Sequence, residues 1–302
     1  MQINAGTLSG LFTGFKTAFN AGFSATTANY EKFAMVVNSG TSEEKYAWLG
    51  QFPQLREWLG ERHIHWLADN DFVIKNKDFE VTISVPRNTI EDDQYGLFKP
   101  LFETMGQDAK THPDKLCYGL VSKGFTTKCY DGQNFFDHDH PVGHGGLETS
   151  YSNMQDGDGP AWFLFDGTKA LKPLVFQKRR DYNFVAIDDP ASEQVFFKRQ
   201  YVYGVDGRAN VGFGLWQLAF GSKAALTPEN YEAARTAMQD VRGDYGPKLG
   251  VTPNLLVVPN ALEGAARRLV KNDLRVVTVG DSAVSASNEW AGSADLIVSP
   301  FL

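Results

Sequence analysis

Hydrophobic residues near the N-terminus recur with the period of an α-helix. They are spaced at i, i+3, i+4, i+7 and i+11, and they are Leu8, Leu11, Phe12, Phe15 and Phe19. This spacing aligns the side chains in one stripe, although Gly10 and Gly14 weaken the helix. Lys16 is the one lysine near the stripe, so the basic face of a membrane-surface helix is missing. The pattern predicts an amphipathic helix that packs on its own chain or on a neighbouring copy.

Hydrophobic and polar residues alternate from Phe72 onwards. The apolar positions are Phe72 and Ile74, followed by Phe79, Val81, Ile83 and Val85. Such alternation is typical of half-buried strands, and the polar residues 76–78 between the two runs favour a turn. We therefore expect a β-hairpin. Because a lone hairpin is marginally stable in water, it must join a larger sheet or rest on a partner. Trp58 and Trp66 just upstream add apolar surface that also needs covering.

The strongest helical pattern follows Pro86. The acidic residues 91–93 favour a helix start, because negative charge complements the helix dipole. The apolar stripe consists of Phe98, Leu101, Phe102, Met105 and Ala109, and it resumes as Leu116, Leu120 and Val121. Pro113 interrupts the stripe, and Gly124 is typical of a helix end. The pattern predicts a long helix from about Asp93 to Lys123 with a break at His112 and Pro113.

Strand patterns dominate the middle of the chain. Residues 130–160 come first, and their Gly, Asp, His and Ser residues are typical of loops with at most short strands. The expected strands are Trp162–Phe165, Leu174–Gln177, Gln194–Val205 and Val211–Phe220. Asp206 and Gly207 favour a turn between the last two strands.

Helices and strands alternate after residue 220. Thr227 and Pro228 are typical of a helix start, and Tyr231, Ala234, Met238 and Val241 share one face of that helix. The continuous apolar run Leu255–Val258 predicts a strand buried on both faces.

The last residues complete the pattern. Asn260 and Glu263 have the spacing of a capping box that begins another helix, whose inward side is Leu262, Ala266 and Leu269. Leu274–Val279 and Leu296–Val298 are expected to complete the sheet. The whole chain therefore predicts an α+β fold without an internal repeat.

Composition narrows the classes of protein. The chain of 302 residues is 42% hydrophobic and 22% charged, which is typical of an ordered protein with one extended architecture or two domains. Its formal net charge of −7 argues against tight nucleic-acid binding. Cys117 and Cys129 are too few for a disulfide framework or a cysteine-based zinc site, and we expect both to be reduced. Neither a signal peptide nor an apolar run long enough for a bilayer occurs, so we expect a soluble protein made in the cytoplasm.

The order of these elements resembles a family of shell proteins. A helical arm, a protruding hairpin, a long helix, a strand-rich middle and a compact helix and sheet domain are similar to the Hong Kong 97 major capsid fold of tailed phages. Two segments sharpen the resemblance. Val85–Asp93 looks like the link from E-loop to spine helix, and Asn254–Glu263 looks like the strand-to-helix junction of the axial domain.

A narrower resemblance is to the Mu-like prophage major head subunit family, gene product T. Its characteristic stretches are matched in order by residues 32–39, 46–50, 129–137 with His140 and Pro141, 203–205 and 214–219. The resemblance implies an N-terminal arm (1–58), an E-loop hairpin (59–90), a peripheral domain (91–222) with the spine helix (91–124), and a mainly axial domain (223–302).

The resemblance also implies the function and the partners. The chain is expected to assemble with itself as pentamers and hexamers into an icosahedral virion capsid, in the host bacterial cytoplasm, with expansion from a procapsid. Portal and scaffolding proteins are the implied neighbours, packaged double-stranded DNA makes only weak non-specific contact, and there is no membrane and no cofactor. Candidate contacts between subunits are the apolar and basic residues of the arm and the hairpin, namely Phe12, Phe15, Phe19, Trp66, Phe72, Lys75, Lys77 and Phe79.

A histidine-rich loop supports an alternative hypothesis, in which the protein binds a metal ion. His138, His140 and His144 lie beside Asp137 and Asp139, and imidazoles with carboxylates are common zinc ligands. A metal-dependent hydrolase would use this loop. Its spacing is not that of a helical zinc motif and glycines surround it, so we favour a solvated turn without a metal.

Other chemistry lacks a convincing motif. Gly212–Gly214 is a fragment of a dinucleotide fingerprint, and neither a phosphate-binding P-loop nor a nucleophile elbow occurs. We therefore expect a protein that is not an enzyme. A nanocompartment shell of the same fold, which encloses protein in place of DNA, remains a further alternative.

Overall fold

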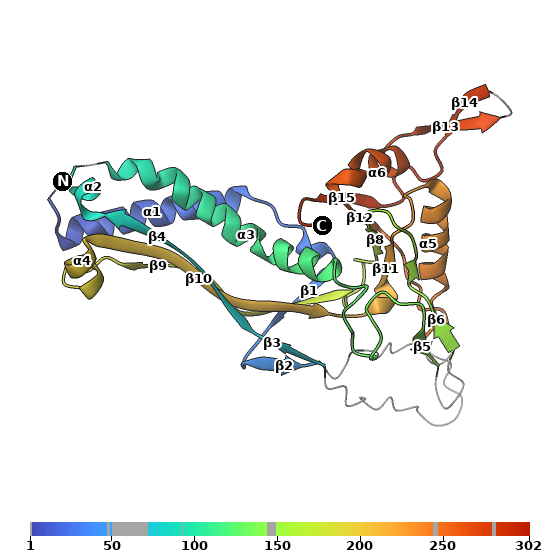
Figure 1. Cartoon of the computed structure of the whole chain (residues 1–302), viewed down its shortest axis with the longest axis horizontal. Coiled ribbons are helices and arrows are strands. Elements are labelled where there is room, and N and C mark those ends of the chain that lie inside the picture. The colour runs from blue at the N-terminus through green and yellow to red at the C-terminus, as the bar shows by residue number, and fades with distance from the viewer. Residues whose placement is uncertain are drawn as a thin grey trace.

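The structure is a computed structural model that describes residues 2–46, 49, 72–92, 94–143, 149–243, 247–279 and 282–302. An elongated part and a compact part follow one another along the longest axis (Figure 1). In the elongated part, two long helices cover one face of a four-stranded sheet. In the compact part, shorter helices pack on a five-stranded sheet. The α+β class is as expected.

The predicted N-terminal helix is present as α1 (Ala5–Ala25). Asn4 caps it, because the Asn4 side chain accepts from Thr7 N at 2.9 Å and the Thr7 hydroxyl accepts from Asn4 N at 3.0 Å. The apolar stripe packs on the second long helix and on the sheet of the same chain. Of the two arrangements expected for this stripe, the structure shows packing on its own chain.

The second long helix, α3 (Lys99–Val121), runs through Pro113 without a break. The predicted break is wrong. Pro113 removes one backbone hydrogen bond, but the burial of Ala109 and Cys117 on either side of it offsets this cost and keeps the helix continuous. The acidic residues do not begin this helix either. The short α2 (Arg87–Glu91) ends there, a 3₁₀ turn η2 (Tyr95–Phe98) follows, and Asp93 lies outside the described residues.

Two glycines let α1 and α3 cross at close range. A Cβ at Gly106 would lie 2.1 Å from the Phe19 carbonyl oxygen, and a Cβ at Gly22 would lie 2.0 Å from the Glu103 carbonyl oxygen. Only glycine fits these positions, so the two helix backbones are in direct contact. Aromatic rings from both helices pack beside the crossing. Phe15 and Phe102 stack at 4.3 Å between ring centroids.

The four-stranded sheet has the order β1 (Ala34–Asn38), β9 (Leu174–Ile187), β10 (Gln200–Phe213) and β4 (Lys77–Pro86). A 3₁₀ turn, η1 (Tyr30–Lys32), precedes β1. The predicted turn at Asp206 and Gly207 is wrong. β10 continues through both residues with a register shift, because β9 and β4 pair with it on its two sides and hold it extended.

The predicted hairpin of residues 72–85 is also wrong in its pairing. The strands exist as β3 (Val73–Lys75) and β4, but β3 pairs with β2 (Glu43–Lys45) and β4 pairs with β10. Asn76 separates β3 from β4, and its side chain donates to Ser39 and to the Thr41 carbonyl oxygen. Local alternation identified the strands, whereas their partners lie far away in the sequence.

The segment expected as a strand from Gln194 begins as a helix. α4 (Glu193–Lys198) connects β9 to β10 at the far end of the elongated part (Figure 1). Ser192 caps α4 at its start, and Arg199 ends it with a left-handed backbone at φ 55°.

In the expected loop region, the described residues 130–143 and 149–160 hold short strands, namely β5 (His140–Val142), β6 (Thr149–Tyr151) and β7 (Met154–Gln155). β8 (Trp162–Phe165) has the predicted bounds. The predicted strand 211–220 is divided, because a 3₁₀ turn η3 (Trp216–Leu218) separates β10 from β11 (Ala219–Ser222).

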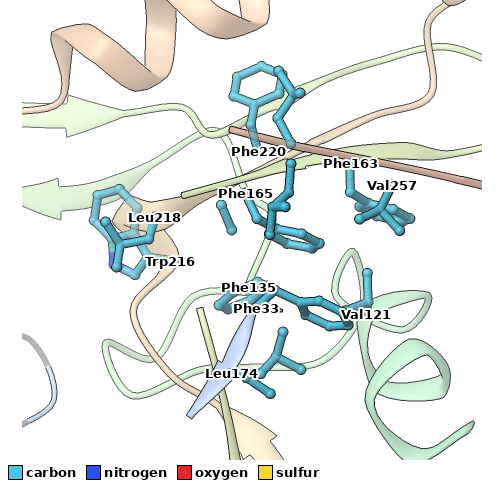
Figure 2. Close-up of a cluster of buried hydrophobic side chains, with 14 of the residues drawn as sticks. Phe33, Val121, Phe135, Phe163, Phe165, Leu174, Trp216, Leu218, Phe220 and Val257 are labelled. Carbon is cyan, nitrogen blue, oxygen red and sulfur yellow. The ribbon is translucent and has the colours of Figure 1, made fainter. Parts of the chain in front are cut away.

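The compact part contains the five-stranded sheet, in the order β15 (Asp295–Ser299), β12 (Leu255–Pro259), β8, β11 and β7. β12 is buried on both faces as predicted, and α5 (Pro228–Asp240) begins at the predicted cap, Thr227. Figure 2 shows the core of this part, where side chains from β8, β11 and β12 meet Phe33, Val121 and Phe135 from distant segments.

Two expectations for the last residues are wrong. The helix α6 (Glu263–Val270) has no side-chain cap, because residues 260–262 form a 3₁₀ turn, η4 (Asn260–Leu262), and Glu263 pairs with Arg267. β13 (Leu274–Val279) does not join the sheet. Among the described strands it pairs with β14 (Ser282–Ser287) alone, and the two form a separate ribbon that projects from the compact part (Figure 1).

Candidate assembly surfaces and the histidine loop

The two described histidines of the histidine loop, His138 and His140, do not come together as ligands. His138 is exposed, and its ring nitrogens lie 3.1 Å from the Ser152 hydroxyl and 2.9 Å from an Asp156 oxygen. His140 is completely buried and its ring stacks on Trp216 at 4.0 Å. His144 lies outside the described residues.

His140 belongs instead to a buried group with Asp131 and Cys129. The His140 Nδ1–H donates to one Asp131 oxygen at 2.6 Å, and the Cys129 thiol donates to the other at 3.0 Å. Although burial alone would raise the pKa of Asp131, these two hydrogen bonds lower it below its usual value. Burial, with the nearby Asp131 charge, raises the pKa of the Cys129 thiol, which therefore stays protonated.

This group fits a structural role better than a catalytic one. Its three possible ligand atoms lie within 4.8 Å of one another, but they already satisfy one another by hydrogen bonds. A catalytic zinc keeps a position open to water and substrate, whereas Cys129 and His140 are buried. The group joins the turn at residues 129–134 to strand β5, and Gly132 enables that turn with φ +88°.

The predicted contact residues of the arm lie mostly inside the subunit. Phe15 and Phe19 are each 4% exposed. Phe12 is half-buried and its ring lies 5.5 Å from that of Phe184 in β9. Only Phe12, of these three, keeps surface that another copy can reach.

The predicted contact residues of the hairpin are spread over two sheets. Lys75 in β3 is exposed and forms an ion pair with Glu43 at 3.8 Å, and Lys77 opens β4 with an exposed side chain. Phe72 is half-buried against the main core, and Phe79 is half-buried with its ring 4.3 Å from His112. Trp66 lies outside the described residues.

The largest exposed apolar side chains were not among those predicted. At the far end of the elongated part, Phe196 and Phe197 in α4 are 73% and 72% exposed. On the β13–β14 ribbon, Leu274 and Val276 are 62% and 75% exposed. The sequence did hold a signal for Phe196 and Phe197. Consecutive side chains point in different directions, so a short helix cannot bury both against the same surface.

No helix in the described ranges is both long and apolar enough to cross a lipid bilayer. Contiguous exposed apolar surface like that of α4 and the β13–β14 ribbon marks protein interaction sites.

The fold is that of a phage shell subunit. The chain is similar to the subunit in the procapsid of bacteriophage JBD30, with a TM-score of 0.85 and 39% sequence identity over 99% of this chain and 100% of that one. The JBD30 capsid subunit gives a TM-score of 0.76 and 31% identity over 92% of each chain. These matches define a major capsid protein of the Hong Kong 97 type.

Sequence comparison identifies the family. Residues 8–302 match the model described as Mu-like prophage major head subunit gpT. The major capsid protein of Escherichia phage Mu is 38% identical over the whole of both chains. The Mu-like prophage FluMu major head subunit of Haemophilus influenzae is 40% identical over 97% of this chain and 96% of the relative.

The chain belongs to the Mu-like prophage major head subunit gpT family, as its sequence motifs implied. It is a structural component of a phage capsid and not an enzyme. The comparisons give no support to the metal-dependent hydrolase.

Proposed function

We propose that copies of this chain close, as pentamers and hexamers, into an icosahedral shell around packaged double-stranded DNA. The observation that carries this proposal is the exposure of large apolar side chains at both ends of an elongated subunit, on α4 and on the β13–β14 ribbon. A subunit that is uncovered at two opposite ends gains stability when neighbours cover both. Many weak contacts of this kind become strong together once a shell closes.

Residues 59–90 are the proposed E-loop, and their described part holds β3 and β4. Within it, β3 pairs antiparallel with β2, and we take this pair as the base of the loop. The exposed Lys75 and Lys77 lie beside this base, where a neighbouring subunit would meet them. We retain α3 as the spine helix, the elongated part with its sheet as the peripheral domain, and the part after residue 223 as mainly axial.

Other virion proteins are proposed as neighbours. The matched JBD30 capsid includes a form decorated with minor capsid protein trimers, and this chain is proposed to accept proteins of that class, together with a portal and a separate scaffolding protein. Assembly is proposed to take place in the host bacterial cytoplasm. The net charge of −7 implies weak, non-specific contact with DNA.

Electron microscopy of the chain co-expressed with its phage scaffolding protein tests the proposal. We expect closed shells of uniform size, and in a phage infection the same shells should protect DNA from nuclease. A small discrete oligomer under all these conditions would contradict the shell. Shells that hold only cargo protein would point to a nanocompartment.

A further inference from the structure

The helix α4 presents two aromatic rings to solvent at the far end of the elongated part. Phe196 and Phe197 lie edge to face, with their ring centroids 5.1 Å apart. Each is more than 70% exposed. Aromatic side chains with this exposure are rare on isolated surfaces and frequent at the centres of protein interfaces. We name these two side chains the phenylalanine knob.

The surrounding backbone holds the knob in place. Val195 is 2% exposed and anchors α4 to the body. Arg199 takes a left-handed backbone, donates its N–H to the Val195 carbonyl oxygen at 3.0 Å, and accepts from Arg87 N at 2.9 Å. A left-handed backbone costs about 1–2 kcal/mol in a residue with a side chain. The exposure of the rings is thus a feature of an ordered turn and not of a fraying end.

A groove lies at the same end of the subunit, between α1 and the end of β9. It has a volume of about 630 Å³. Its lining residues are mostly apolar and consist of Ala5, Leu8, Ser9, Phe12, Phe184, Val185, Ala186, Asp188, Asp189 and Pro190. We call the two aspartates, which follow β9, the acidic rim. Grooves of this volume hold groups of the size of aromatic side chains. We name it the α1–β9 groove.

The knob and the groove are complementary in charge as well as in polarity. Lys198 and Arg199 follow the knob directly and are exposed. The groove rim carries Asp188 and Asp189. Within the part of the chain that the structure describes, none of these four side chains forms an ion pair.

A second copy of this chain is the partner that fits. The knob does not fill the groove of its own subunit, because both rings remain exposed. A neighbouring copy carries the same knob with the same basic flank, and a shell supplies such neighbours at every subunit. Apolar rings would enter the apolar floor while the basic residues face the acidic rim.

We propose that Phe196 and Phe197 of one subunit dock in the α1–β9 groove of the next, with Lys198 and Arg199 opposite Asp188 and Asp189. Because donor and acceptor surfaces differ, the contact is head-to-tail, and repetition around an axis closes a ring. The inference rests on the proposed shell, since it assigns one contact within it.

Charge exchange tests the contact directly. Lys198→Glu and Asp188→Lys should each raise the protein concentration needed for shell assembly by roughly tenfold or more, because each places like charges at the rim. The double variant should assemble close to the wild-type concentration, since the ion pair is restored with reversed sign. Lys198→Arg, which keeps the charge, is the matched control. A double variant no better than the single variants would overturn the proposed pairing.

Removal of the rings tests the knob independently of charge. Phe196→Ser with Phe197→Ser should prevent assembly at wild-type concentrations, while Phe196→Leu with Phe197→Leu should retain most of it. Circular dichroism and thermal unfolding of the unassembled subunits should match wild type, because these side chains do not contribute to the core. Normal shells from the serine variant would overturn the inference and leave the shell itself standing. Absence of shells from the wild type would count against the proposed function.

Discussion

The buried pair of His140 and Asp131 consists of residue types that often bind metals, but here the pair stabilises the fold. The His140 Nδ1–H donates to an Asp131 oxygen, and the ring of Trp216 covers the imidazole, whose Nε2 is buried without a hydrogen-bond partner. Removal of Asp131 leaves the buried His140 without a hydrogen bond, which costs more than the pair contributes. The loop at residues 129–134 and strand β5 would then lose their connection.

The first prediction concerns this pair. Asp131→Asn should lower the free energy of unfolding of the unassembled subunit by about 1–3 kcal/mol, because the charge-assisted hydrogen bond from His140 is lost. Urea unfolding near neutral pH measures the change. Asp156→Asn is the matched control, since the Asp156 side chain is 78% exposed in its contact with His138, and it should change stability by less than about 0.5 kcal/mol.

We also expect the stability effect of Asp131→Asn to depend on pH. The pKa of Asp131 is lowered in the folded chain from a usual value of 3.8. A carboxyl group with a lowered folded pKa stabilises the fold above its unfolded pKa and loses that contribution as the pH falls through the folded value. The stability difference between wild type and Asp131→Asn should therefore shrink below about pH 4. A difference that persists undiminished in stronger acid would assign it to packing and not to charge.

At the scale of elements, the crossing of α1 and α3 depends on glycine. Gly106→Ala should lower the free energy of unfolding by about 1–3 kcal/mol or more, because its Cβ would lie 2.1 Å from the Phe19 carbonyl oxygen and force the helices apart. Gly119→Ala lies in the same helix, where nothing within 4 Å would meet the new Cβ, and it should stabilise by about 0.5–1 kcal/mol. Thermal unfolding of both variants measures the contrast. Equal effects of the two substitutions would contradict a close crossing.

The elements themselves could be predicted wherever a periodic pattern and a cap agree. Three examples are the stripe of α1, the Thr227 cap of α5 and the buried run of β12. In each of them the neighbouring residues alone determine the element. Predictions failed where distant contacts decided the outcome. β10 stays extended through Asp206 and Gly207 because strands from elsewhere pair on both its sides, and α3 tolerates Pro113 because of packing.

The candidate contacts could be predicted less well than the elements. A hydrophobic stripe such as Phe15 and Phe19 has the same pattern whether its own chain or a neighbour covers it, and here its own chain does. Exposure depends on the tertiary arrangement. Phe196 was expected within a strand but is exposed on α4, because the end of β9 and the start of β10 leave this helix at the edge of the elongated part.

At the scale of the whole molecule, the β13–β14 ribbon is the second uncovered surface, at the opposite end from α4 (Figure 1). Its two strands pair only with one another, and isolated two-stranded ribbons are marginal in water. Leu274 and Val276 lie on the same face of β13, and their partners across the ribbon are Ser287 and Ser285 of β14. The face thus exposes two large apolar side chains beside small serines, so we expect a neighbouring subunit to cover it in the shell.

The last prediction follows from this face. Leu274→Ser with Val276→Ser should reduce shell assembly by about tenfold or more at a fixed protein concentration, because the apolar area that a neighbour covers is lost. The melting temperature of the unassembled subunit should change little, since both side chains are mostly exposed there. Val276→Ile, which keeps the face apolar, is the control and should assemble normally. Sedimentation of shells away from free subunits measures the yield, and an unchanged yield from the serine variant would show that the ribbon contacts no neighbour.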